Sequence, residues 1–211
     1  DFNPTPTELI SLTAFYKLIK NPISRIEVAS AGGYLSYENI ADKATVAGVE
    51  VEVRKNLFVR PLSSAANGMN KLSFGLNGSY IYTNAKMPLA TVTTGSQLEG
   101  AAPWIANFDL SHNFTKGNHS FINTLVFNYV SDKIYTIGTQ GYQDIIEQGM
   151  MTLDFVSQAK LNKYVSLTLK ARNLLNPSYK LSRKANESGE KVVLSDYKKG
   201  INISLGVSCT F

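Results

Sequence analysis

Apolar and polar residues alternate strictly along the last stretch of the chain. Apolar side chains occupy every second position there: Ile201, Ile203, Leu205, Val207, Cys209 and Phe211. The positions between them carry Asn, Ser, Gly or Thr. Successive side chains of a β-strand point to opposite faces, so the segment predicts a strand with one apolar and one polar face. An apolar face that ends in an aromatic residue is typical of a strand that crosses a membrane.

The same period of two recurs along the chain, and no segment shows a persuasive helical period. Seven further strands are predicted over about residues 8–20, 44–57, 71–83, 103–115, 119–132, 150–162 and 164–174. No Asp, Glu, Lys or Arg lies in the middle of an apolar row of these strands. No apolar run reaches the roughly 20 residues of a membrane helix, so a chain that spans a bilayer must do so as a closed barrel. We therefore expect an all-β protein, an antiparallel transmembrane β-barrel with about eight strands in this chain.

The connections between the predicted strands alternate in length. Tight turns lie near residues 115–119 and 162–164, and a moderate one at 59–70. The other connections are long and polar: residues 21–43, 84–102, 133–149 and 175–199. Outer-membrane barrels have short periplasmic turns and long extracellular loops. If the C-terminus is periplasmic, every long segment is extracellular, and we interpret these segments as surface loops.

Aromatic residues form two groups along the predicted strands. One group gathers toward the short turns and comprises Phe58, Phe74, Phe114, Phe121, Tyr164 and Phe211. The other gathers toward the long segments and comprises Tyr80, Tyr82, Trp104, Tyr129 and Tyr135. Aromatic belts of this kind mark the two interfaces of a membrane, which supports the barrel interpretation.

Charge and composition argue against several kinds of partner and site. The net charge of +5 is spread out, without a basic block interleaved with aromatic residues, so we expect no nucleic-acid partner. The single cysteine, Cys209, excludes an internal disulfide framework and a cysteine-based zinc site. The two histidines, His112 and His119, flank a tight turn, and we expect two exposed residues at the barrel rim. We predict no metal and no cofactor.

Several segments, in this order, resemble the C-terminal part of TonB-dependent outer-membrane receptors. They are LISLTAFYKLIKNPISRIE (9–27), ATVAGVEVEVRKNL (44–57), LSFGLNGSYIYTNA (72–85), LEGAAPWIANFDLSHNF (98–114), MTLDFVSQAKLNKYVSLTLKARNLLNPSY (151–179) and the terminal strand. The resemblance implies a 22-stranded barrel, to which residues 1–211 contribute about the last eight strands as one domain without a plug.

The resemblance also implies partners and a location. The location is the bacterial outer membrane, and the partners are its lipid, the rest of the receptor barrel with its plug, and indirectly the TonB system. In outer-membrane barrels a terminal aromatic helps the barrel assembly machinery to recognise the last strand, and Phe211 is the candidate here. Two alternatives stay open: a complete small eight-stranded outer-membrane barrel, and a soluble β-sandwich binding module with its apolar faces turned inward.

The sequence offers no catalytic constellation, so we expect a transport protein rather than an enzyme. Substrate-binding candidates are charged residues on the polar faces of the strands, which a barrel turns toward its lumen. These candidates are Glu50, Glu52, Arg54, Asp109, Asp154, Lys170 and Arg172. The simpler interpretation of each is a solvated or ion-paired residue of the barrel wall. The sequence leaves the transported substrate open.

Overall fold

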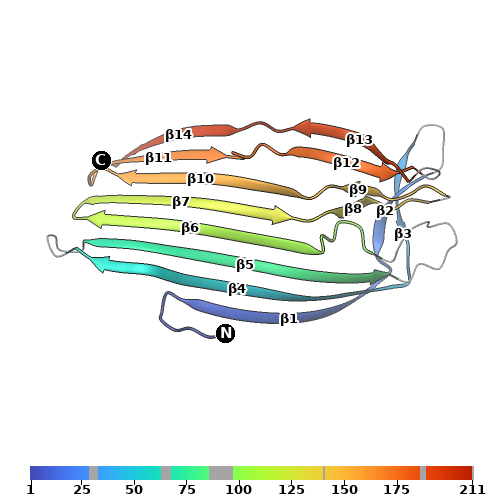
Figure 1. Ribbon diagram of the computed structural model, residues 1–211, viewed down its shortest axis with the longest axis horizontal. Helices are drawn as coiled ribbons and strands as arrows, with labels where there is room; N and C mark the ends of the chain where they lie inside the picture. The colour runs from blue at the N-terminus through green and yellow to red at the C-terminus, as the bar shows by residue number, and fades with distance from the viewer. Residues whose placement is uncertain (29–32, 63–67, 86–96, 140, 186–188, 211) are drawn as a thin grey trace.

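The computed structural model describes residues 1–28, 33–62, 68–85, 97–139, 141–185 and 189–210. Their main feature is an eight-stranded sheet in which every neighbouring pair is antiparallel (Figure 1). In spatial order its strands are β1 (Leu9–Lys20), β4 (Lys43–Pro61), β5 (Met69–Ala85), β6 (Trp104–Lys116), β7 (His119–Val130), β10 (Met150–Lys160), β11 (Val165–Arg172) and β14 (Asn202–Cys209). These are the eight predicted strands, which confirms the all-β fold class.

The strand register places the apolar rows of all eight strands on one face. Leu12 lies opposite Val51 across β1 and β4, and Leu167 lies opposite Val207 across β11 and β14. Among the described residues, no second sheet packs across this face. Leu12 is 70% exposed and Leu205 72% exposed. A β-sandwich would bury both side chains, so the sandwich alternative is wrong.

The opposite face carries the small polar and charged residues. Asn77 lies opposite Asn107 across β5 and β6, and Lys170 lies opposite Ser204 across β11 and β14. This polar face also holds hydrogen bonds between strands, such as the one that Asn128 donates to Thr152 Oγ1 at 3.1 Å. The sheet is thus one layer with an apolar and a polar side, as a barrel wall requires.

Three of the long segments are not the surface loops that the sequence predicted. Residues 21–43 contain the hairpin of β2 (Ile23–Glu27) and β3 (Leu35–Asn39). The segments 133–149 and 175–199 form a four-stranded sheet beyond one end of the main sheet (Figure 1). In spatial order its strands are β13 (Lys191–Lys198), β12 (Ser178–Lys184), β9 (Ile145–Glu147) and β8 (Lys133–Thr136). The prediction failed because several of these strands are too short or too polar to give a clear period of two.

The β2–β3 hairpin crosses the long-segment end of the molecule and packs against the four-stranded sheet (Figure 1). Ile26 forms a parallel bridge with Ile137, and the two are buried with Ile40 and Ile134 in the main apolar cluster of the described residues. Two ion pairs, both with mostly buried side chains, join the hairpin to other segments. Arg25 binds Glu99 at 2.8 Å, and Arg183 binds Glu27. Arg25 also stacks on the Tyr135 ring, 3.8 Å from its centroid.

A turn rich in asparagine carries the chain from the main sheet into the four-stranded sheet. Asn173 and Asn176 have φ of 58° and 45°, a left-handed conformation that Asn tolerates better than most residues. The Asn173 backbone N–H donates to Asp154 Oδ1 at 2.8 Å, and its side chain donates to the Gly200 carbonyl at 2.7 Å. Asn176 Oδ1 accepts a hydrogen bond from the Gly200 N–H. The turn therefore fixes β11, β12 and the start of β14 relative to one another.

The two outer strands of the main sheet each have one free edge. In the described residues β1 pairs with β4 and, at Ile10 alone, with Phe2, whereas β14 pairs only with β11. The two strands lie on opposite sides of the sheet (Figure 1). The barrel is not closed within this chain. A complete eight-stranded barrel requires β1 to pair with β14, and the structure does not contain that pairing.

We expect Gly48→Val to destabilise the sheet by about 1–3 kcal/mol, the usual cost of overpacking. A Cβ atom at Gly48 would lie 2.4 Å from Phe15 Cζ and 2.7 Å from the Tyr80 carbonyl oxygen. Gly78→Val is the matched control, because the nearest atom to its Cβ is the Ile105 carbonyl oxygen at 3.9 Å. Unfolding midpoints in urea measure the effect, and equal midpoints for the two variants would contradict it.

Asn173→Ala should destabilise the turn more than Asn173→Gly, by about 1 kcal/mol. Both variants lose the hydrogen bond to Gly200, but only Ala is strained at a φ of 58°. Thermal unfolding of both variants beside the wild type measures the difference. If Ala is tolerated as well as Gly, the left-handed backbone is not what selects Asn at this position.

Candidate functional site

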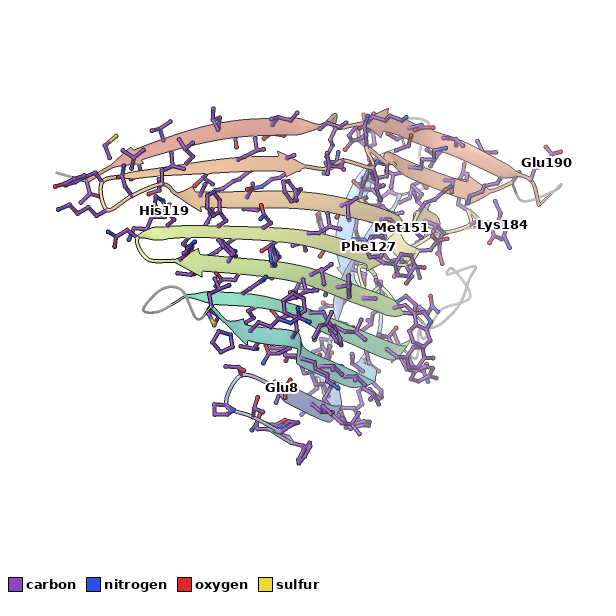
Figure 2. The ribbon with its side chains drawn as sticks, turned by 60° about the vertical axis from the view of Figure 1, so that its left-hand side comes forward. Glu8, His119, Phe127, Met151, Lys184 and Glu190 are labelled. Atoms are coloured by element: carbon purple, nitrogen blue, oxygen red, sulfur yellow. The ribbon has the colours of Figure 1, made fainter. Side chains whose placement is uncertain are left out.

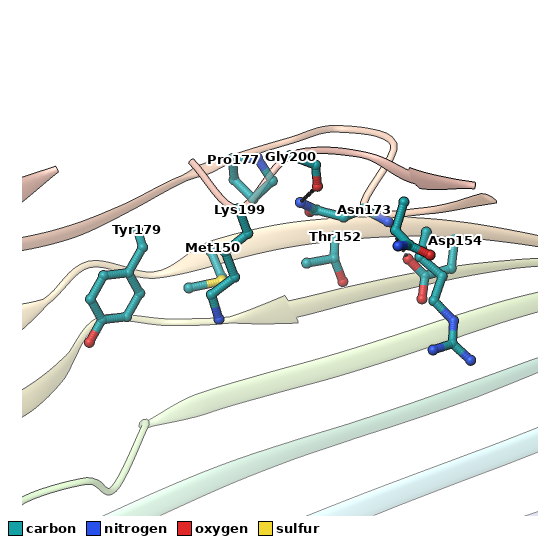
Figure 3. Close-up of a pocket in the computed structure, with 10 residues that line it drawn as sticks. Met150, Thr152, Asp154, Asn173, Pro177, Tyr179, Lys199 and Gly200 are labelled. Carbon is teal, nitrogen blue, oxygen red and sulfur yellow. Dashed lines mark hydrogen bonds between the residues drawn. The ribbon is translucent and has the colours of Figure 1, made fainter. Parts of the chain in front are cut away.

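The described residues form a cavity of about 370 Å³ on the polar face, where the main sheet meets the β12–β13 hairpin (Figure 3). Its lining comes from β10, the end of β11, the asparagine turn, both ends of that hairpin and the start of β14. The lining residues are Met150, Thr152, Asp154, Arg172, Asn173, Pro177, Tyr179, Lys199, Gly200 and Asn202. The asparagine turn forms one wall, and the Asn173–Gly200 hydrogen bond visible in Figure 3 holds that wall to the start of β14.

The cavity combines two cations with one carboxylate. The Asp154 carboxylate already accepts the backbone N–H of Asn173, whereas Arg172 and Lys199 have no ion pair within the described residues. Lys199 Nζ lies 5.9 Å from the centroid of the Tyr179 ring. Guanidinium and ammonium groups attract carboxylates and phosphates, and a cation beside an aromatic ring is held near that ring. The cavity can therefore bind a polar ligand that carries an anionic group.

Tyr179 belongs to the four-stranded sheet and forms the aromatic side of the cavity. Its ring packs on Tyr197 with 5.0 Å between centroids, and its hydroxyl donates to Glu147 Oε2 at 3.4 Å. Burial, followed by the nearby Glu147 carboxylate, raises the pKa of Tyr179 to about 12. The phenol therefore stays protonated at physiological pH and remains a hydrogen-bond donor.

A second charged cluster lies on the same face over β4, β5 and β6. Arg54, Gly75 and Asp109 occupy one register row, and Arg54 Nε donates to Glu52 Oε1 at 2.6 Å. The absence of a side chain at Gly75 makes room for Asp109, whose Oδ1 would lie 2.3 Å from a Cβ there. Two cavities of about 310 and 80 Å³ border this cluster. The Arg54 side chain beside them is 67% exposed.

The structure brings five of the seven predicted lumen residues into two sites and leaves two outside them. Asp154 and Arg172 line the first cavity, while Glu52, Arg54 and Asp109 form the second cluster. Glu50 and Lys170 share the polar face but line neither site; they lie opposite Ser79 and Ser204.

The sequence reasoning did not single out Asn173, Tyr179, Lys199 and Asn202 as site residues. The signal that was present is the run Asn-Leu-Leu-Asn-Pro at 173–177, because two Asn residues just before a Pro indicate a turn with side-chain hydrogen bonds. The role of Lys199 had no local signal, since it depends on the hairpin bringing residue 199 beside residue 179.

The two histidines do not both lie at the barrel rim as expected. His119 is exposed at the turn between β6 and β7 (Figure 2). His112 lies two register rows farther into the sheet, half-buried on the apolar face, with Nε2 at 2.8 Å from Asn70 Oδ1. No group of three or more His, Cys, Asp or Glu residues in the described part of the chain is arranged to hold a metal ion. Phe211 lies outside the described residues.

No helix among the described residues is long and apolar enough to span a membrane.

Comparison with known proteins gives one family. The family described as TonB dependent receptor-like, beta-barrel matches residues 1–174. No curated protein and no solved structure matches the chain. Members of this family are transport receptors of the bacterial outer membrane, not enzymes, and they act with a plug domain and the TonB system. With most of its length matched, the chain belongs to the TonB-dependent receptor-like β-barrel family.

Proposed function

We propose that this chain is the C-terminal barrel wall of a receptor that takes up its substrate actively across the outer membrane. The observation that carries the proposal is the sheet's uncovered apolar face, with side chains such as Leu12 and Leu205 about 70% exposed. In water so large an apolar surface would be a liability, whereas in a bilayer it meets acyl chains. The polar face then borders the lumen through which the substrate passes.

The proposed orientation places the short turns in the periplasm and the four-stranded sheet outside the cell. Supporting it, the β6–β7 turn needs only the two residues between Lys116 and His119, and the β10–β11 turn is held by Asn162. The aromatic groups also separate: Phe114 packs near Phe121 toward the turns, and Tyr80 packs on Trp104 toward the four-stranded sheet. This separation, with Tyr and Trp toward one end and Phe toward the other, agrees with an aromatic belt at each membrane interface.

The free edges of β1 and β14 support a larger barrel. Backbone N–H and C=O groups cannot stay unpaired in hydrocarbon, so each edge needs a partner strand. We propose that these partners are the remaining strands of the 22-stranded receptor, with residues 1–211 as one barrel domain and the plug supplied from elsewhere in the receptor. The TonB system would then act on the plug and not on this wall.

The substrate would meet this wall at the two polar-face sites. Arg172 and Lys199 are the proposed contacts for an anionic group of the substrate in the larger cavity, with Asp154 and Asn202 beside them. Glu52, Arg54 and Asp109 are weaker candidates in the second cluster, and Glu50 and Lys170 belong to the wetted wall between extracellular entrance and periplasmic exit.

Site-directed spin labels on β14 test the wall. With Cys209 replaced by Ala, single cysteines at residues 203 to 208 are labelled in the receptor reconstituted in lipid vesicles. Labels at 203, 205 and 207 should be accessible to oxygen, which dissolves in acyl chains. Labels at 204, 206 and 208 should be accessible to a water-soluble nickel chelate, because alternate side chains face the lumen. Accessibility without a period of two, or with the two faces exchanged, would refute the proposal.

Deletion of Phe211 tests the proposed contact with the assembly machinery. The receptor without Phe211 should reach the cell surface at a clearly lower level, whereas Phe211→Tyr, which keeps an aromatic ring, should remain close to wild type. Surface labelling and gel mobility with and without heating measure folded receptor. Unchanged surface levels after the deletion would show that the terminal aromatic is dispensable.

A further inference from the structure

The apolar rows of β5, β6, β7 and β10 share a polar interruption close to the short turns. It consists of Asn70 on β5, His112 on β6, Asn123 on β7 and Ser157 on β10. His112 lies directly opposite Asn123, and Asn123 lies directly opposite Ser157. All four positions belong to the apolar rows, since their neighbours along the strands are residues such as Leu72, Leu110 and Leu125. We call these four residues the polar row.

The polar row satisfies only part of its own hydrogen-bonding capacity. Ser157 Oγ donates to Asn123 Oδ1 at 2.7 Å, and His112 Nε2 lies 2.8 Å from Asn70 Oδ1. The amide NH₂ groups of Asn70 and Asn123 have no acceptor among the described residues. The second ring nitrogen of His112 has no hydrogen-bond partner there either. Donors left unpaired against hydrocarbon are costly, so an outside acceptor is needed.

The rows around the polar row form an ordered series along β6 and β7. Starting from the turn, the pairs are Lys116–His119, Phe114–Phe121, His112–Asn123 and Leu110–Leu125. Figure 2 places His119 at the turn end of the sheet, far from Lys184 and Glu190 at the opposite end. Because one step of two residues advances about 6–7 Å along a strand, the three steps of this series cover about 20 Å of strand, from a cationic through an aromatic and a polar to an aliphatic pair.

A further cation stands beside the polar row. A β-bulge between Asn56 and Phe58 shifts the register of β4, so that Phe58 pairs with Leu72 and Arg60 pairs with Asn70 on the apolar face. Arg60 lies over the Phe58 ring, 5.5 Å from its centroid, and its side chain is exposed. Without the bulge, Arg60 would point to the polar face with Arg54.

Charge on this face has one sign. On the eight strands, the positions of the apolar rows include five cations, Lys20, Lys43, Lys55, Arg60 and Lys116, but no Asp or Glu. Of these, Arg60 and Lys116 lie at the short-turn end of the sheet. The carboxylates of the main sheet, Glu50, Glu52, Asp109 and Asp154, all lie on the other face. Clustered cations next to a membrane favour anionic lipids.

We propose that the polar row and its two cations form a binding site for one anionic phospholipid of the periplasmic leaflet. Its phosphate lies between Arg60 and Lys116, its ester carbonyls accept hydrogen bonds from Asn70 and Asn123, and its acyl chains cover Leu110 and Leu125. His112 is the link that holds Asn70 in place. The inference rests on the proposed function only in that the apolar face must meet lipid.

The test uses the whole receptor in mild detergent, incubated with equal amounts of phosphatidylglycerol and phosphatidylcholine and examined by native mass spectrometry. The wild type should retain phosphatidylglycerol preferentially. Arg60→Gln with Lys116→Gln should abolish that preference. His112→Leu with Asn123→Leu should lower the retention of both lipids about tenfold, the effect of losing roughly one hydrogen bond to a charged or polar partner.

Asn128→Leu is the matched control, because Asn128 lies on β7 like Asn123 but on the polar face, where it bonds Thr152. It should leave lipid retention unchanged. Because leucines at 112 and 123 suit a lipid-facing surface, that variant is expected to fold, and the Arg60/Lys116 variant provides an independent measurement if it does not.

Three results would overturn the proposal. The first is lipid retention that neither pair of substitutions changes. The second is displacement of the retained lipid by millimolar inorganic phosphate, which would indicate a site for free phosphate. The third is that the two double variants lose a co-purifying protein while their lipid retention stays unaltered, which would indicate a protein interface. In each case the spin labels on β14 report separately whether the wall itself faces lipid, so failure of the lipid site is distinguished from failure of the proposed function.

Discussion

Backbone hydrogen bonding in a medium without water is the constraint on which the rest of this structure depends. A sheet in hydrocarbon must pair every N–H and C=O group with another strand. The six interior strands of the main sheet do so on both sides, from β4 through to β11. The free edges of β1 and β14 are therefore the two places where the proposed further strands of the receptor would pair.

In the paired sheet, the alternation along each strand places every side chain on one of two faces, an apolar one and a polar one. Rows such as Leu76–Phe108 and Leu153–Phe127 face one way, and rows such as Asn77–Asn107 and Thr152–Asn128 face the other. Charge follows the same division, because the main-sheet carboxylates lie on the polar face and the apolar face carries only cations. The polar row is the informative exception, because it breaks the division at the depth where lipid itself offers hydrogen-bond acceptors.

The cavity on the polar face arises where the chain leaves the membrane-type sheet. Asn173 and Asn176 redirect the chain while their side chains replace the lost ladder hydrogen bonds, and Asp154 holds the turn from the neighbouring strand. This arrangement leaves Arg172 and Lys199 without carboxylate partners beside a protonated Tyr179. A rigid turn that leaves two cations unpaired is suited to ligand binding more than to stability.

The sequence by itself determined the eight main strands, their two faces and the position of Glu52, Arg54, Asp109 and Asp154 on the polar face, because each follows from alternation within one strand. It could not determine the β2–β3 hairpin or the four-stranded sheet. Their strands are short, and their stability comes from distant contacts such as Ile26 with Ile137 and Arg183 with Glu27. Tertiary structure also decided the bulge that turns Arg60 outward, the grouping of Arg172 with Lys199 and the alignment of His112 with Asn123, since register between strands is set by pairing that no single strand encodes.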